Sequence, residues 1–241
     1  MTDATTVRAS GPTDEAARPT GQPTAEPAAA TGPPEGWGAG MWRLSGHSEV
    51  PGWLLLPAQV DDTDAWVAAG VAEIESAWQE HWRPEQAPVV AALLRNGLIA
   101  RPDEAALAFQ LWPVPAPLVA HVHASFGARP AGLVLGPDDG VLYDAAGLGQ
   151  GIQLPLRVHD DAAGVDLIGV QLVFLSADAA VQVTFEPTVP ELFGMLVGQF
   201  HAVVQSLELV GPDGQPVLAH APQGFPDAAA DATWPGSLPA V

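Results

Sequence analysis

"VDLIGVQLVFLSADAAVQVTFEP" (residues 165–187) and the "TVPELFGMLVGQFHAVVQSLEL" that follows it (188–209) decide the fold. The first stretch predicts two long strands joined by a tight connection, and strands joined in this way pair antiparallel. The second predicts a helix that starts at a capping box of Thr188 and Glu191, with Pro190 in its first turn. Apolar residues at helical spacing form its expected buried face: Leu192, Leu196, Phe200, Val203 and Leu207.

Two further helices are predicted near the N-terminal end. In the first, apolar side chains return every three or four residues along one face, after a cap provided by the acidic stretch 61–64. That face consists of Val67, Val71, Ile74, Trp78 and Trp82. The second helix spans "PEQAPVVAALLRNG", residues 84–97, and is expected to stop at Asn96-Gly97, a pair typical of a left-handed helix end. In the C-terminal helix, Gly194 and Gly198 are expected to let the helix approach the sheet closely.

Short runs with strand character fill the rest of the core. They are 41–46, 51–58, 106–112, 118–127, two short strands about the turn at 137–140 within 131–147, and 152–159, and most are bounded by Gly or Pro. Two helices, then a run of strands, then one long helix is an α+β order and differs from alternating βαβ units. The prediction is therefore an α+β fold, with a mostly antiparallel sheet packed by two N-terminal helices and one long C-terminal helix.

The two ends differ in composition from the middle of the chain. Residues 1–40 are rich in Ala, Pro and Thr without apolar periodicity, and cannot bury enough surface to offset the entropy of ordering. Residues 221–241 have the same character. We expect a disordered N-terminal tail over 1–40, a single α+β domain over 41–220, and a flexible acidic tail over 221–241.

The charge of the chain excludes several partners. It has 28 acidic residues against 8 basic ones, all of which are arginine, for a formal charge of −20. Nucleic-acid backbones and anionic lipids bind clustered cations, so we expect neither as a partner. No apolar stretch approaches the length of a membrane span and no signal peptide is visible, so the expected location is the cytoplasm.

Motifs of catalysis are absent from the sequence. The chain has no cysteine, which excludes disulfides, zinc–thiolate sites and thiol catalysis. It has no nucleophile elbow, no phosphate-binding loop and no dinucleotide fingerprint. We therefore expect no catalytic residue, no cofactor and no bound metal.

The hairpin and its helix carry a resemblance to known domains. "VQLVFLSADAAVQVTFEP" (170–187) and "PELFGMLVGQFHAVVQSLEL" (190–209) resemble the closing half of PsbP-like and LpqN-like α/β sandwich domains in the order of their elements. The resemblance covers a quarter or less of the core and assigns no functional residue. "VPGWLLLP" (50–57), before a Trp-bearing helix, is similar to the opening of uncharacterised actinobacterial proteins.

One strand carries two histidines on one face. In "LVAHVHASFG" (118–127) alternate side chains share a face, so Ala120, Val122 and Ala124 point one way. His121 and His123 then point the other way, at a separation that suits chelation of one ion. A metal site needs a third ligand as well.

The best candidate for that ligand lies in the strand over 152–159. There Ile152, Leu154, Leu156 and Val158 form the expected apolar face, which leaves Gln153, Arg157 and His159 on the polar one. If the two strands were neighbours, His159 could join His121 and His123. Arg157 would repel a cation and suits an anionic ligand instead. Adjacency of 118–126 and 152–159 stays open at this point.

The sequence favours a non-catalytic binding module that recognises another protein or a small ligand. Its expected binding residues are His121, His123, Arg157 and His159. The alternative is a metal-dependent hydrolase built on the His-x-His strand, with His159 and an acid such as Asp160 completing the site.

Overall fold

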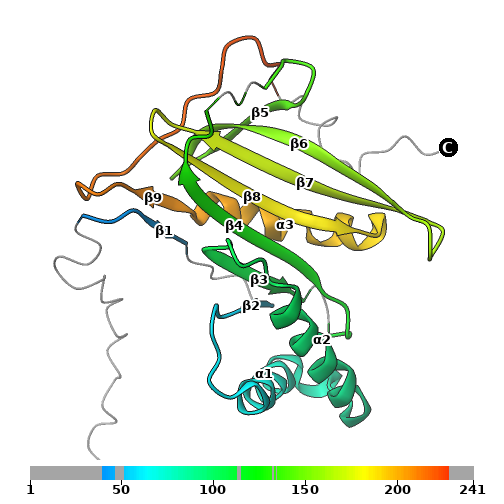
Figure 1. Ribbon diagram of the computed structural model, residues 1–241. Helices are drawn as coiled ribbons and strands as arrows, with labels where there is room; N and C mark the ends of the chain where they lie inside the picture. Colours follow the sequence, from blue (N-terminus) through cyan, green and yellow to red (C-terminus); the bar gives the residue numbers. More distant parts are fainter. Residues whose placement is uncertain (1–39, 47–51, 113–114, 132, 134, 228–241) are drawn as a thin grey trace, which may run out of the picture. The chain divides into compact units, whose positions relative to one another are not determined.

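The computed structural model describes residues 40–46, 52–112, 115–131, 133 and 135–227, and its fold is α+β as predicted (Figure 1). The tails predicted at the two ends lie outside the described residues, apart from Gly40 and residues 221–227. Within the described residues no helix is long and apolar enough to cross a bilayer.

A seven-stranded antiparallel sheet forms the centre of the fold, in the order β2-β3-β4-β8-β7-β6-β5. Its strands are β2 Trp53–Leu55, β3 Leu107–Leu111, β4 Ala120–Ala128, β5 Val141–Ala145, β6 Gly149–Asp160, β7 Val165–Leu175 and β8 Ala179–Thr188. Outside this sheet, β1 (Arg43–Ser45) pairs antiparallel with β9 (Glu208–Val210). The predicted hairpin is confirmed as β7 and β8, which lie near the middle of the sheet.

The helix α3 (Pro190–Ser206) packs on one side of the sheet, which we call the α3 face (Figure 1). Phe185 of β8 is fully buried there, with its ring centroid 4.9 Å from that of Phe193 and 5.4 Å from that of Phe200. Val122 and Ala124 of β4 join the same core. This packing fixes which side of each central strand is apolar.

The helices α1 (Thr63–Trp78) and α2 (Ala87–Ala100) pack on the opposite face, where they meet β2 and β3. Short 3-10 turns at Gln79–His81 and Pro84–Gln86 join them. The predicted stripe of α1 is confirmed: Val67, Ile74 and Trp78 are buried in a second core, and Val71 and Trp82 pack against it. Asp62 caps α1, because its carboxylate accepts a hydrogen bond of 2.9 Å from the Ala65 amide.

The predicted end of α2 at Gly97 is wrong. The helix continues to Ala100, and Gly97 lies inside it with a buried backbone. A Cβ atom on Gly97 would lie 2.8 Å from Cδ of Gln110, and closer still to its amide nitrogen. Glycine is therefore needed for the close approach of a β3 side chain, and not for a left-handed helix stop.

Two expectations for α3 are also wrong. Thr188 is the last residue of β8 and pairs with Ile168, so Val189 is the N-cap and no side chain caps the helix. Gly194 and Gly198 have no atom within 4 Å of an added Cβ, so they do not face the sheet. Small residues at this spacing therefore mark the outer side of α3.

The chain stays against the sheet beyond residue 220. The amide of Leu142 donates a hydrogen bond of 2.9 Å to the carbonyl of Pro226, and Phe225 is only 8% exposed. This contact lies along β5, the last strand of the sheet.

Gly97→Ala is expected to lower the free energy of unfolding by about 1–3 kcal/mol, because the new methyl group displaces the Gln110 amide. Gly194→Ala is the matched control on an open helix surface, and should raise that free energy by about 0.5–1 kcal/mol through the higher helix propensity of alanine. Urea unfolding of both variants measures the difference. Equal effects of the two substitutions would contradict the close approach at Gly97.

Candidate functional site

The structure separates the four predicted binding residues into two places. β4, which carries His121 and His123, is divided from β6 by β8 and β7, so residues 118–126 and 152–159 are not neighbouring strands. His121 and His123 lie on the face opposite α3, as their alternation with buried Ala120, Val122 and Ala124 predicts. His159 therefore cannot complete a site with them.

The polar side predicted for β6 is the side that faces α3. Gln153 pairs with Leu172, whose neighbours belong to the main core, and is itself only 3% exposed. The predicted polar side of β6, with Arg157 and His159, is thus on the same side of the sheet as α3. An amphipathic alternation shows that two faces differ, but the neighbouring strands decide which face meets which helix.

His121 and His123 meet a carboxylate that the sequence did not indicate. His123 Nδ1 lies 3.4 Å from Glu186 Oε1, and His121 Nδ1 lies 3.6 Å from Glu186 Oε2. The side chain of His121 is 23% exposed, that of His123 is 15% exposed, and that of Glu186 is 33% exposed. We call His121, His123 and Glu186 the histidine–glutamate cluster.

A β-bulge positions Glu186. Between the pairs Val170–Phe185 and Ile168–Thr188, β7 has the single residue Gly169, whereas β8 has both Glu186 and Pro187. A Cβ atom on Gly169 would lie 2.5 Å from the Phe185 carbonyl oxygen. Bulges redirect side chains, and proline is tolerated in a strand at such points. The Glu-Pro pair inside an alternating strand was the signal available in the sequence.

Gln110 connects this cluster to α2. It is fully buried on β3 opposite His121, and its amide nitrogen donates a hydrogen bond of 2.8 Å to the Leu93 carbonyl. The same nitrogen lies 3.2 Å from Nε2 of His121. Because an amide nitrogen only donates, Nε2 of His121 accepts, and the neutral ring carries its proton on Nδ1, toward Glu186.

Burial lowers the pKa of His121 below its ordinary value, which favours the neutral ring. The Glu186 carboxylate opposes this shift in part, and His123 adds to it. The direction agrees with the hydrogen bond from Gln110, which needs an unprotonated Nε2.

The histidine–glutamate cluster is closed to organic ligands. The cavity that touches its three residues has a volume of about 10 Å³, the lower limit for one water molecule. Nδ1 of His123, Oγ1 of Thr184 and Oε1 of Gln110 are buried without a hydrogen-bond partner in the described part of the chain. An imidazole beside a carboxylate can act as a general base, but a space of about 10 Å³ has no room for an organic substrate beside His123.

A metal site needs three ligands around one point. Among the residues that the structure describes, no group of three or more His, Asp or Glu side chains is arranged to hold a metal ion. Nε2 of His121 is also engaged by Gln110, so only its Nδ1 faces the cluster.

Arg157 and His159 lie at the exposed tip of the β6–β7 hairpin. His159 Nδ1 is 2.7 Å from Oδ1 of Asp166, its ladder partner, and Nε2 is 3.8 Å from Asp161. A shallow hollow of about 290 Å³ is bordered by Arg157, His159 and Asp166. Because the His159 side chain is 56% exposed, these contacts are solvated surface pairs of small energetic weight.

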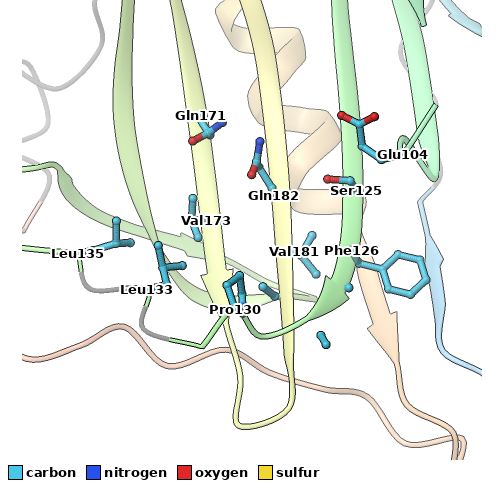
Figure 2. Close-up of a pocket in the computed structure, with 13 residues that line it drawn as sticks. Glu104, Ser125, Phe126, Pro130, Leu133, Leu135, Gln171, Val173, Val181 and Gln182 are labelled. Atoms are coloured by element: carbon cyan, nitrogen blue, oxygen red, sulfur yellow. The ribbon is translucent and has the colours of Figure 1, made fainter. Parts of the chain in front are cut away.

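The face opposite α3 also has a larger cavity, which the sequence analysis missed (Figure 2). Its volume is about 390 Å³. Its walls come from β4, β7, β8, the segment before β3 and the segment after β4. They include Glu104, Ser125, Pro130, Leu133, Leu135, Gln171, Val173 and Gln182. We call this the sheet cavity. The signal for it was the row of polar side chains at alternate positions of β8, which are Gln182, Thr184 and Glu186.

The sheet cavity and the histidine–glutamate cluster occupy successive rows of the same sheet face. Ser125 pairs with Gln182, which pairs with Val173. The next row consists of His123, Thr184 and Gln171. Rows two residues apart along a strand are separated by about 7 Å, so the two sites lie close together. α2 and the segment after it border the cluster, whereas the row at Gln182 is open.

No protein-family model, no curated protein and no solved structure matches this chain. The resemblance to PsbP-like and LpqN-like domains stays a prediction.

The free energy of unfolding is expected to fall as the pH is lowered through about 6.5, the ordinary pKa of histidine. The pKa of folded His121 is depressed, so the unfolded chain binds the proton first, and stability is lost down to the folded-state pKa. His121→Gln should flatten this part of the profile. Urea unfolding at several pH values measures it, with the exposed His81→Gln as control; the same slope in wild type and His121→Gln would refute the assignment.

Proposed function

We propose that this domain is a binding module that takes a small ligand in the sheet cavity. The observation that carries the proposal is the cavity itself, of about 390 Å³, whose lining combines apolar side chains with the polar groups of Ser125, Gln171 and Gln182. Ligand sites are typically concave, about 300–1,000 Å³ in volume and mostly apolar, with a few polar groups that orient the ligand.

The expected partners and location are part of this proposal. A formal charge of −20 disfavours nucleic acid and anionic lipid, and a small ligand is preferred to a protein because the sheet cavity is concave. We place the domain in the cytoplasm on the sequence features given above.

A metal-dependent hydrolase on the His-x-His strand is the second candidate. One observation favours it, since Glu186 lies within 3.6 Å of an Nδ1 atom on each of the two histidines. The third ligand expected from the sequence, His159, lies on the other side of the sheet. Calorimetric titration with Zn²⁺ separates the two candidates: one-to-one binding that His123→Ala removes would favour the hydrolase.

Gln182→Trp is expected to abolish ligand binding, because Gln182 stands in the middle of the cavity row and an indole fills the space above it. A ¹H–¹⁵N NMR screen of small molecules against the wild-type chain should give shifts confined to residues around Ser125, Gln171 and Gln182. These shifts should vanish in Gln182→Trp. Met195→Trp is the control, since Met195 is 51% exposed on α3 and does not line the cavity. Shifts that persist in Gln182→Trp would place binding elsewhere.

A further inference from the structure

The sheet cavity is divided into a polar end and an apolar end (Figure 2). Figure 2 shows the polar groups of Gln171, Gln182, Ser125 and Glu104 toward one end. The other end is lined by Pro130, Leu133, Leu135 and Val173. Such a separation fits an amphipathic ligand, whose head group takes the hydrogen bonds while a short hydrocarbon part covers the apolar end.

The polar end carries a negative charge and no positive one. Glu104 is the single charged residue in the described lining of the cavity. No hydrogen bond or ion pair involves its carboxylate within the described part of the chain. The remaining polar groups there, a hydroxyl and two amides, are neutral. A cationic head group would therefore gain an ion pair, whereas an anionic head group would meet repulsion.

Arg101 holds the segment that presents Glu104. Its guanidinium donates hydrogen bonds to the carbonyls of Pro102 and Ala105, in the connection between α2 and β3, and to that of Leu56, just after β2. The amide of Ala106 also donates to the Ala124 carbonyl at 2.9 Å. Glu104 is thus fixed at the rim by backbone contacts on both sides, and its own side chain is left for a ligand.

The arginines beside the lining segments are occupied elsewhere. The guanidinium of Arg101 binds the three carbonyls just named and does not line the sheet cavity. Arg129 follows β4 and precedes Pro130, but its guanidinium donates to the Ser176 carbonyl at 3.0 Å. Neither cation is positioned for an anionic ligand, and a chain with 28 acidic residues attracts cations in general.

We propose, on the premise of the binding function above, that the ligand of the sheet cavity is a small amphipathic primary amine in its ammonium form. Its three N–H groups are shared between the Glu104 carboxylate, the Ser125 hydroxyl and the Gln182 side-chain carbonyl. Its hydrocarbon part lies against Val173, Pro130 and the leucines of the apolar end. A charge-assisted hydrogen bond to Glu104 distinguishes this ligand from neutral and anionic molecules of the same shape.

The experiment compares three probes of equal chain length on the full-length protein: hexylammonium, hexanoate and 1-hexanol. ¹H–¹⁵N NMR titration gives the dissociation constant of each from the shifts of Ser125 and Gln182. We expect hexylammonium to bind tightest, and Glu104→Gln to weaken it roughly fivefold without changing 1-hexanol. Asp103→Asn is the matched control, since Asp103 is the neighbouring exposed acid and does not line the cavity. The dissociation constant of hexylammonium for the Asp103→Asn variant should equal that for the wild type.

The outcomes separate the inference from the proposed function. Hexanoate or 1-hexanol binding at least as tightly as hexylammonium, or unchanged hexylammonium binding to Glu104→Gln, would overturn the ammonium assignment and leave a ligand site in place. Shifts from none of the three probes at Ser125 and Gln182 would overturn both. The unfolding temperature of Glu104→Gln should match that of the wild type, so that weaker binding by this variant reflects the lost carboxylate and not a loss of folded protein.

Discussion

The rest of the structure depends on the packing of α3 against the centre of the sheet. Phe185 of β8 is buried between the rings of Phe193 and Phe200, and this contact commits one side of β8 and its neighbours to the interior. Because side chains alternate along a strand, Thr184 and Glu186 must then point the other way. The same rule directs His121 and His123 to that side of β4. The polar groups of both sites therefore share one face because an aromatic core occupies the other.

The face opposite α3 has one closed site and one open site because helices cover only part of it. α1 and α2 pack over β2 and β3, where Gln110 and Gly97 bring helix and sheet into contact. Under this edge the histidine–glutamate cluster is enclosed in a space of about 10 Å³. One row farther along β4 and β8 the cover ends, and a cavity of about 390 Å³ opens. The closed histidine–glutamate cluster and the open sheet cavity are therefore only one row of the sheet apart.

The α+β fold, the order of its helices and its central hairpin could be predicted from periodicity, because each is a local property of the chain. The alternation on β4 likewise predicted that His121 and His123 share the face opposite Val122, but it did not predict that Glu186 and the end of α2 enclose them. Strand order could not be predicted in this way. Because β8 and β7 lie between β4 and β6, His159 is remote from His121 and His123, and the side chain beside them is Glu186. Gly97 and the Thr188–Glu191 pair were misread for a related reason. Their local patterns fit a helix end and a cap, but a β3 side chain and a strand partner decide their roles.

The two edges of the large sheet are short or covered. β2, at one edge, has only three residues, and β5, at the other, gives the amide of Leu142 to the carbonyl of Pro226. An unpaired edge is the template by which folded β-proteins add further chains and grow into fibrils. Phe225 is buried, and its neighbour Pro226 pairs with β5, so residues 211–227 cover the β5 edge. Removing that stretch would leave a five-residue strand open to self-association, a hazard that matters for any shortened version of the chain.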